Sequence, residues 1–360
     1  MATASAAVDL IADARSVSSL ADTPSDLQDY RSLVDFMDLS IICVNWNSID
    51  YLESCIASVI KYTSEISFEI IVVDNASPAN DDVDRLKSSF PNVLTIRCRE
   101  NVGFAKANNL GYRQSAGEYI LFLNPDTRLQ GPAINTMLSA AKTLRGAAII
   151  GCRLLNADLS IQTSCVQKVP TIINQLLDAE VLHRSWPGCP LWDISPLYGD
   201  DTDVAKVEVI SGACMLVKRS VFEQIGLFSE DYFMYADDID LCWKAIQGGL
   251  ANYYVGKATI IHYGGGSSQQ QEINNWATIM KFRSVEKFCA KRRGRWYAHL
   301  FRVAMGIAAV ARLLLITALL GCRGNSAKGA ITRAALCKWT AILKWSLGLD
   351  HLVNPMTSEI

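Results

Sequence analysis

The first third of the chain alternates between short apolar runs and segments in which apolar residues recur every three or four positions. Leu39–Val44 is a continuous apolar run, as expected for a parallel strand that is buried on both faces. After Ser48, a suitable helix N-cap, five apolar residues share one helical face. They are Leu52, Cys55, Ile56, Val59 and Ile60. This pattern predicts a strand followed by an amphipathic helix.

The same alternation continues through three more predicted strands. The strands are Phe68–Val73, Val93–Arg97 and Glu118–Leu123, and the helices are Asp81–Phe90 and Phe104–Ser115. Strands that alternate with helices favour a mostly parallel, doubly wound sheet that is flanked by helices. The predicted fold class is therefore α/β.

The pattern becomes less regular after Ala147. Residues 156–205 are irregular and contain four prolines, and they resemble an insertion on the acceptor side. The other predicted elements are strands at Ala147–Gly151, Val207–Val217, Tyr253–Val255 and Thr259–Ile261, and a helix at Asp238–Gln247. We expect one domain at residues 38–280, after a flexible leader at residues 1–37.

The last part of the chain is both apolar and basic. From Lys281 to Leu349 it has fourteen Lys or Arg residues and one acidic residue, Glu286; this net +13 contrasts with −15 elsewhere, in a chain whose total is −2. Such a region suggests contact with anionic lipid. We therefore predict a helical, membrane-associated region at residues 281–360.

Val303–Gly321 bears on how this region meets a membrane. Its 19 residues are enough to span a bilayer. However, Arg312 near its centre costs about 2.5–3.5 kcal/mol on insertion scales, and basic flanks disfavour placing either end outside. We therefore expect a peripheral or re-entrant arrangement at the cytoplasmic face of the inner membrane. A soluble helical subdomain is the alternative.

The composition argues against several classes of protein. A net charge of −2 argues against a general nucleic-acid binder. The eleven cysteines are scattered without a CxxC pair, which is typical of reduced thiols in a cytosolic protein. Residues 2–30 lack a basic start and an apolar run, so they do not predict a signal peptide.

Polar residues follow each of the first four predicted strands. They are Asn45 and Asn47, then Asp74, Asn75 and Ser77, then Asn101 and Gly103, and finally Asn124 and Asp126. Ligands of an open α/β sheet bind at the carboxyl ends of its strands, so we expect these residues to converge on one edge. Asn and Asp side chains there can hydrogen-bond a base and a ribose, and a glycine permits close approach of the backbone.

A diphosphate bound at this edge needs a source of positive charge. The chain has neither a GxGxxG nor a GxxxxGK[ST] loop. Asp126 follows a strand and a turn that contains Pro125, and its carboxylate suits Mg2+ or Mn2+, which would bridge it to phosphate oxygens. The alternative is that Asp126 only caps a turn.

Two further sites carry candidate chemistry. Asp237, Asp238 and Asp240 lie near a predicted helix start, where the dipole favours acids as caps. Alternatively, one carboxylate takes the proton of an acceptor hydroxyl, with its pKa raised by burial. His262 follows an apolar strand and precedes three glycines, so it is a candidate metal or phosphate contact, or a structural histidine.

Between Leu39 and Ser268 the chain resembles the family 2 glycosyltransferases of the GT-A fold, particularly their bacterial rhamnosyltransferase-like branch. Seven blocks in order carry the resemblance: VNWN from Val44, VDNAS from Val73, NVGFAKANNLG from Asn101, LNPDT from Leu123, SGACMLV from Ser211, YFMYADDIDLCW from Tyr232 and HYGGGSS from His262. Together these blocks are far more specific than any one of them alone.

The resemblance implies a role for each candidate residue. Asp74 and Asn75 would hold a uracil or thymine nucleoside. With the residues at the strand ends, the expected donor site comprises Asn45, Asn47, Asp74, Asn75, Asn101, Gly103, Asn108 and Asn124. Asp126 and His262 would hold the metal. Asp238, with Asp237 beside it, would be the general base of an inverting single displacement.

The chain departs from the family pattern at two places, and it lacks one motif of the processive members. The usual Glu-Asp pair reads Asp237-Asp238, and Asn124 replaces the first carboxylate of the DxD motif. Processive synthases of the family carry QxxRW, but here Arg295-Trp296 is preceded by Arg292 in place of the glutamine. We therefore expect addition of a single sugar.

The sequence as a whole predicts a metal-dependent, inverting and non-processive glycosyltransferase. Its donor would be a nucleoside-diphosphate sugar, dTDP-rhamnose first and a UDP-sugar next. Its acceptor would be a glycan or a lipid-linked molecule in cell-surface polysaccharide synthesis. Two alternatives remain, which are a nucleotidyltransferase, whose usual Gly-rich start is missing here, and a degenerate nucleotide-sugar-binding protein.

Overall fold

The computed structural model describes residues 37–78, 82–177, 189, 203–264, 275–323 and 327–349. The chain divides into two compact units. The first is drawn from Met1–Lys168, Ile194–Phe233 and Asp237–Ser267, and the second from Val169–Asp193, Met234–Ala236 and Ser268–Ile360. Nearly all of the expected leader and much of the expected acceptor-side insertion lie outside the described residues.

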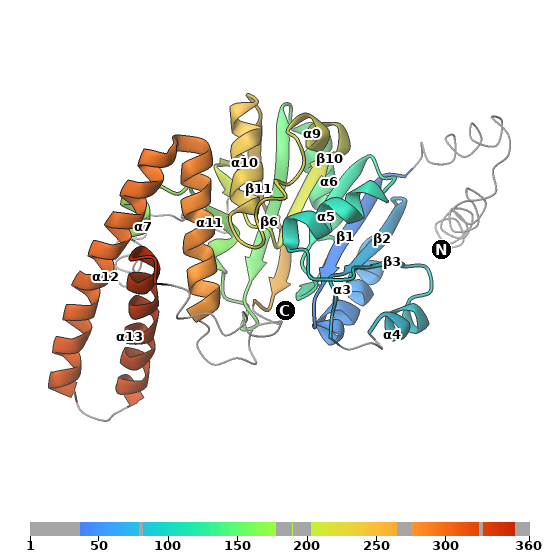
Figure 1. Ribbon diagram of the computed structural model, residues 1–360. Helices are drawn as coiled ribbons and strands as arrows, with labels where there is room; N and C mark the ends of the chain where they lie inside the picture. Colours follow the sequence, from blue (N-terminus) through green and yellow to red (C-terminus); the bar gives the residue numbers. More distant parts are fainter. Residues whose placement is uncertain are drawn as a thin grey trace. The chain divides into compact units, whose positions relative to one another are not determined.

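Within the described residues, a nine-stranded sheet forms the centre of the first unit (Figure 1). Its order is β3-β2-β1-β4-β10-β6-β11-β5, and β8 pairs with β11. The strands are β1 (Leu39–Asn45), β2 (Phe68–Asp74), β3 (Leu94–Arg97), β4 (Tyr119–Leu123), β5 (Thr127–Leu129), β6 (Ala147–Leu155), β8 (Val204–Val207), β10 (Cys214–Lys218) and β11 (Ala251–His262).

Most of these strands point in one direction. β1 is parallel to β2 and β4, β2 is parallel to β3, and β6 is parallel to β11. Because β10 is antiparallel to both β4 and β6, the six parallel strands share a single direction. The prediction of an α/β fold with a mostly parallel sheet is therefore confirmed.

Helices flank this sheet (Figure 1). They are α3 (Ile49–Tyr62), α4 (Asp82–Ser89), α5 (Phe104–Arg113), α6 (Ala133–Thr143), α9 (Arg219–Gln224) and α10 (Asp237–Gln247), and a 3-10 turn lies at Thr163–Cys165. Four of the five predicted apolar positions of α3 are at most 1% exposed, but Ile60 is 50% exposed. The prediction for Ile60 is wrong because it lies roughly 80° around the helix from Leu52 at 100° per residue.

Two strand predictions also need correction. The segment Val207–Val217 is not one strand, because β8 ends at Val207, a short strand β9 (Val209–Ile210) pairs with β7 (Val166–Gln167), and β10 starts at Cys214. The short strands predicted at Tyr253–Val255 and Thr259–Ile261 belong to one strand, β11, whose register with β6 shifts between Val255 and Thr259. In both places an irregular backbone lies inside an apolar run, which the pattern of side chains does not reveal.

Four helices make up the described part of the second unit. They are α7 (Ile172–Leu176), α11 (Asn275–Arg293), α12 (Arg295–Arg323) and α13 (Ala327–Ser346), and α12 and α13 lie side by side (Figure 1). Phe282, Phe301 and Trp345 join α11, α12 and α13 through ring contacts of 5.5–6.4 Å between centroids. Among the described helices, only α12 is long and apolar enough to cross a membrane, over Arg295–Ala318, by length and composition alone.

Candidate active site

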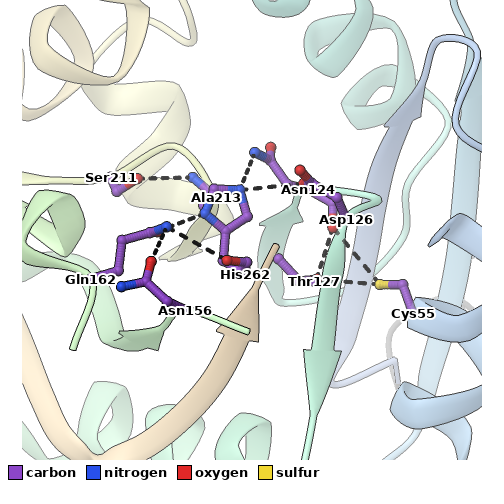
Figure 2. Close-up of polar contacts among 9 residues, drawn as sticks. All are labelled: Cys55, Asn124, Asp126, Thr127, Asn156, Gln162, Ser211, Ala213 and His262. Carbon is purple, nitrogen blue, oxygen red and sulfur yellow. Dashed lines mark hydrogen bonds and ion pairs between the residues drawn. The ribbon is translucent and has the colours of Figure 1, made fainter. Parts of the chain in front are cut away.

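Asn124, Asp126 and His262 meet where β4 ends and β5 pairs with the end of β11 (Figure 2). The pairing sets Thr127 opposite His262, and the Tyr263 N–H donates to the Asp126 carbonyl at 2.9 Å. His262 Nε2 lies 3.3 Å from Asp126 Oδ1 and 3.4 Å from Asn124 Nδ2. The two predicted metal residues are therefore neighbours, and their side chains are only 15% and 10% exposed.

Gln162, which the sequence did not predict as a site residue, holds the other side of the His262 ring (Figure 2). Its Oε1 lies 2.7 Å from His262 Nδ1, while its Nε2 donates to Asn156 Oδ1 at 3.2 Å. An amide oxygen can only accept, so Nδ1 of His262 donates to Gln162, and Nε2 faces Asp126. No local motif marks Gln162, because only the pairing of distant strands brings it to His262.

A second polar cluster lies at the carboxyl ends of β1 and β2, on the same sheet edge. Asn45 Nδ2 donates to Asp74 Oδ1 at 3.2 Å and to Ser77 Oγ at 3.1 Å. The Ser77 hydroxyl donates to the same Asp74 oxygen, and the Ser48 hydroxyl donates to Asn45 Oδ1 at 2.9 Å. Ser48 occupies the predicted N-cap position of α3, but its side chain makes no capping hydrogen bond with the helix.

The second carboxylate oxygen of Asp74 is left incompletely satisfied. Asp74 is 2% exposed, and its Oδ2 has no hydrogen-bond partner among the described residues, although Arg97 Nε lies 3.8 Å away. Burying an acceptor without a hydrogen bond costs about 1–3 kcal/mol. A ligand N–H or O–H would remove that cost.

Asn75 and Asn101 shape the loop before α5. Asn75 Nδ2 donates to Asn101 Oδ1 at 2.8 Å, and the N–H groups of Val102 and Gly103 donate to Asn75 Oδ1 and Asn101 Oδ1 at 2.9 and 3.0 Å. Gly103 has a φ of +82°, and a Cβ there would lie 2.4 Å from the Phe233 carbonyl oxygen. The predicted close approach exists, but its partner in the chain is the Phe233 backbone.

Two other predicted donor residues lie apart from these contacts. The Asn47 side chain is exposed; its φ of 53° is left-handed, and only its backbone N–H is tied, to Ser77 Oγ at 2.9 Å. Asn108 is 1% exposed and donates to the Phe104 carbonyl one turn earlier at 3.0 Å. Neither side chain bonds another predicted donor residue within the described part of the chain.

The acidic group at the start of α10 divides into different environments. Asp240 is fully buried and accepts hydrogen bonds from the hydroxyls of Ser229 at 2.6 Å and Tyr232 at 3.4 Å, so its role is structural. Asp237 is 4% exposed, and its Oδ2 has no hydrogen-bond partner among the described residues. Burial, and then the charge of Asp238, raise the pKa of Asp237 to about 8.

Asp238 is half-buried and accepts backbone hydrogen bonds at both carboxylate oxygens. Its Oδ2 accepts from the Gly212 N–H at 2.9 Å, and its Oδ1 accepts from the Ile239 N–H at 2.8 Å. Hydrogen bonds of this kind favour the ionised form. The two neighbouring acids therefore differ: burial raises the pKa of Asp237 and favours its neutral form, whereas both oxygens of Asp238 accept backbone N–H groups.

The turn at residues 211–213 connects this acid to the first cluster. The Ala213 carbonyl accepts the Asn124 N–H at 2.9 Å, and the Gly212 N–H donates to Asp238 (Figure 2 shows Ala213 and Asn124). The Ser211 hydroxyl accepts from the Ala213 N–H at 3.3 Å and so braces the turn. One short turn therefore contacts both the Asn124–Asp126 segment and the candidate base.

Comparison with known proteins adds a family and a fold. The family model described as "Glycosyl transferase family 2" matches residues 40–226. An N-acetylglucosaminyl-diphospho-decaprenol L-rhamnosyltransferase of Mycobacterium tuberculosis is 28% identical over 270 residues, covering 72% of this chain and 86% of that protein. Rhamnosyltransferase WbbL of Escherichia coli K12 is 30% identical over 168 residues, covering 45% of this chain and 61% of that protein.

A solved structure has a similar fold. The mannosyltransferase PcManGT from Pyrobaculum calidifontis, in complex with GDP-Man and Mn2+, matches with a TM-score of 0.53 at 16% identity, covering 87% of each chain. At this identity the match supports the arrangement of helices and strands alone.

Proposed function

Because this chain belongs to glycosyl transferase family 2, we propose that it is an inverting, non-processive enzyme that transfers one sugar to a glycan or lipid-linked acceptor. The two relatives named as rhamnosyltransferases favour dTDP-rhamnose as donor, with a UDP-sugar next. Arg292 in place of the glutamine of QxxRW favours a single addition. Family membership also argues against a nucleotidyltransferase.

The observation that carries this proposal is the turn at residues 211–213. It hydrogen-bonds Asn124 on one side and Asp238 on the other, so the segment that faces the leaving diphosphate and the base that faces the acceptor share one rigid support. Reacting groups held in fixed geometry avoid the entropy cost of finding one another. We assign Asp126 and His262 to the donor's diphosphate, and Asp238 to the acceptor.

The nucleoside of the donor belongs at the cluster of Asn45, Asp74 and Asn75 in this proposal. Asp74 Oδ2 has no hydrogen-bond partner among the described residues, only a 3.8 Å ion pair with Arg97, so it suits an N–H of a uracil or thymine ring. Asn101 and Gly103 line the same loop through Asn75. Asn47 and Asn108 are assigned to the donor site by resemblance alone.

A divalent cation fits the residues at the first cluster. Gln162 accepts from Nδ1, which leaves Nε2 of His262 facing Asp126 Oδ1 at 3.3 Å, so a neutral ring would offer its Nε2 lone pair and the carboxylate to one cation. Two acceptors facing each other are stabilised by a cation, and octahedral ligands with bonds of about 2.1 Å lie about 3 Å apart. Asp126 and His262 would hold Mn2+ or Mg2+, which would supply positive charge to the leaving diphosphate.

The rest of the metal's ligands come from outside this pair. Among the described residues, no group of three or more His, Cys, Asp or Glu side chains gathers around one point. Phosphate oxygens and water complete the shell of such ions in many nucleotide sites. We therefore expect the ion and the nucleotide sugar to bind together, with each raising the affinity for the other.

The chain's own acids perform the proton transfer. Asp238 accepts the proton of the acceptor hydroxyl while that oxygen forms a bond to the anomeric carbon and the bond from that carbon to the diphosphate oxygen breaks. The electron pair of the broken bond leaves with the diphosphate. Burial raises the pKa of Asp237 and favours its neutral form, which would leave Asp238 as the acceptor of the proton.

The test is turnover by the purified full chain against a panel of nucleotide sugars, with membrane lipid extract as acceptor and with or without Mn2+ or Mg2+. Metal-dependent transfer from one donor, with the opposite anomeric configuration in the product by NMR, is the expected result. Retained configuration would overturn the single displacement. Donor binding with no turnover anywhere on the panel would favour the degenerate binding protein.

We place the enzyme at the cytoplasmic face of the membrane, where a lipid-linked acceptor is held. The support is the charge of +13 over residues 281–349 and the apolar helix α12.

A further inference from the structure

The outward face of α12 is mostly apolar along the 20 residues from Trp296 to Leu315, and its exposed polar residues up to Ala318 are His299 and Thr317. Its exposed large side chains follow a spacing of four and three residues. They are Trp296, Leu300, Val303, Ile307, Val310 and Leu314, with Leu315 beside them, and their exposed fractions run from 44% to 83%. From Trp296 to Ala318 the exposed residues of this helix include no Asp, Glu, Lys or Arg. A helix surface in water normally carries its charges on the exposed side.

The two arginines within this stretch turn inward. Arg302 donates to the carbonyls of Trp345 at 2.6 Å and Ser346 at 3.2 Å, at the end of α13. Arg312 donates to the Leu176 carbonyl at 2.8 Å and lies 4.1 Å from the centre of the Trp339 ring. The charge that made insertion costly is therefore satisfied inside the unit. Charges inside and apolar side chains outside are the pattern of a surface that faces hydrocarbon.

A lipid surface fits this face better than a second copy of the chain. A two-helix seam is a narrow stripe, usually flanked by charged residues that pair across it. Here the exposed apolar residues span an arc of roughly 140° at 100° per residue, with His299 and Thr317 at one edge. Its flanking positions hold Ala304, Gly306 and Leu313 in place of Asp, Glu, Lys or Arg. A bilayer, unlike a partner helix, accepts so broad an uncharged surface.

The charge at one end of the arc identifies the kind of lipid. Lys291, Arg292, Arg293 and Arg295 come immediately before Trp296, which is 83% exposed. Basic residues beside a tryptophan are typical of the headgroup layer, and each basic residue near the surface strengthens binding to anionic lipid.

The opposite side of α12 decides how it lies. That side packs on α11 and α13, which carry Lys287, Lys338 and Lys344, and Lys338 is exposed. Helices with such side chains cannot be surrounded by hydrocarbon without a large cost. Only one side of α12 is therefore suited to lipid.

We propose that the outward face of α12 lies immersed in one leaflet of a bilayer with anionic headgroups, with the helix axis along the membrane plane. The inference deepens the membrane setting of the proposed function and rests on that function only for the presence of a lipid-linked acceptor. Immersion of about 5–10 Å is usual for such helices.

The first test is co-sedimentation of the full chain with vesicles of phosphatidylcholine alone or with phosphatidylglycerol. Wild-type protein should bind the anionic vesicles, and the triple variant Leu300→Gln, Ile307→Gln, Leu314→Gln should lose about tenfold or more in affinity. The matched control is Ile60→Gln with Leu159→Gln, because both are at least 50% exposed in the sheet unit. The control should bind as wild type does.

Depth measurements separate an immersed helix from a spanning one. Lipids brominated at defined positions along the acyl chain quench tryptophan fluorescence according to its depth. Trp296 and a tryptophan introduced by Ile307→Trp should be quenched at similar depth. The fluorescence of the variant Trp296→Phe gives the contribution of the other tryptophans, which is subtracted. A much deeper signal at position 307 would overturn the axis along the plane. Equal vesicle binding by wild type and the triple variant would overturn the face itself. A third result would also overturn the lipid face: wild type that is a dimer by light scattering and does not bind vesicles, together with a triple variant that is a monomer.

Sugar transfer is read separately from these experiments. Vesicle binding without transfer to any acceptor would remove the proposed function and leave this inference standing. Transfer to a water-soluble acceptor by a chain that does not bind vesicles would support the proposed function and overturn this inference.

Discussion

The two units bury polar side chains in opposite ways. In the sheet unit, Asp74 and Asp237 are almost fully buried, and each has a carboxylate oxygen without a hydrogen-bond partner among the described residues. In the helical unit, Arg302 and Arg312 reach backbone carbonyls and stack on tryptophan rings. Incomplete satisfaction costs stability and persists where a ligand completes it, whereas complete satisfaction serves packing. We therefore interpret the first pattern as a candidate ligand site and the second as a scaffold for the apolar face of α12.

Substitution of Asp238 should give the largest effect and affect chemistry alone. Asp238→Asn should lower turnover by about 100- to 10,000-fold, because a general base contributes about that much. Donor affinity, by calorimetry, should remain. Asp231→Asn, at an exposed position of the same unit, is the control. Full activity in Asp238→Asn would remove the base from the mechanism and leave Asp238 as a cap of α10.

Gln162 tests whether the first cluster holds a metal. Gln162→Ala frees the His262 ring to turn or change tautomer, so the Mn2+ concentration for half-maximal donor binding should rise about 10- to 100-fold. Gln162→Glu should restore the affinity, because a carboxylate also accepts from Nδ1. Gln167→Ala is the control, since Gln167 bonds only the nearby Ser164 carbonyl among the contacts described. An unchanged metal titration would make Gln162 a purely structural residue.

Arg312 tests the scaffold side of the comparison. Arg312→Ala leaves the Leu176 carbonyl without this donor and exposes the Trp339 face, so the helical unit should lose about 1–3 kcal/mol of stability. Hydrogen exchange in α7 and α12 measures that loss. Arg85→Ala, which removes an exposed ion pair in the sheet unit, should leave exchange there unchanged. Faster exchange confined to the sheet unit would contradict the assignment.

Asp237 tests the sheet unit through a dependence of stability on pH. Its folded-state pKa of about 8 lies above the usual 3.8, so the folded chain binds an extra proton between these values. That stabilisation is complete below about pH 4 and is lost as pH rises to about 8. The Asn side chain of Asp237→Asn does not ionise, so this variant does not lose the stabilisation. The difference between its Tm and that of wild type should therefore increase from pH 6 to pH 8. Parallel Tm curves would show that Asp237 is ionised in the folded chain.

Much of the fold was predictable because parallel strands buried on both faces are nearly all apolar. β1, β2 and β4 each match a predicted run to within a residue at either end. The break between β8 and β10 was not predictable, since Val209 and Ile210 are as apolar as a continuous strand would be. The irregularity lies in the backbone at Glu208 and at residues 211–213, which the side-chain pattern does not report.

The candidate site divides along the same line. Residues directly after a strand, such as Asp74 and Asp126, were predictable because the sheet fixes where strand ends lie. Gln162 was not, because it depends on pairing between β6 and β11 and on the bridge from Leu155 to Ile161. The sequence also did not separate Asp237 from Asp238, whose difference comes from burial and from the Gly212 N–H.

The contact between Gly103 and Phe233 has a consequence at the level of genes. Every missense change of one nucleotide in a glycine codon gives a residue with a Cβ, and a Cβ at position 103 would lie 2.4 Å from the Phe233 carbonyl oxygen at a left-handed φ. No such mutation leaves this contact intact, and Phe233 stands four residues before Asp237 in the chain. Alleles at this codon should therefore behave as nulls in a genetic screen, although Gly103 has no side chain that takes part in the reaction.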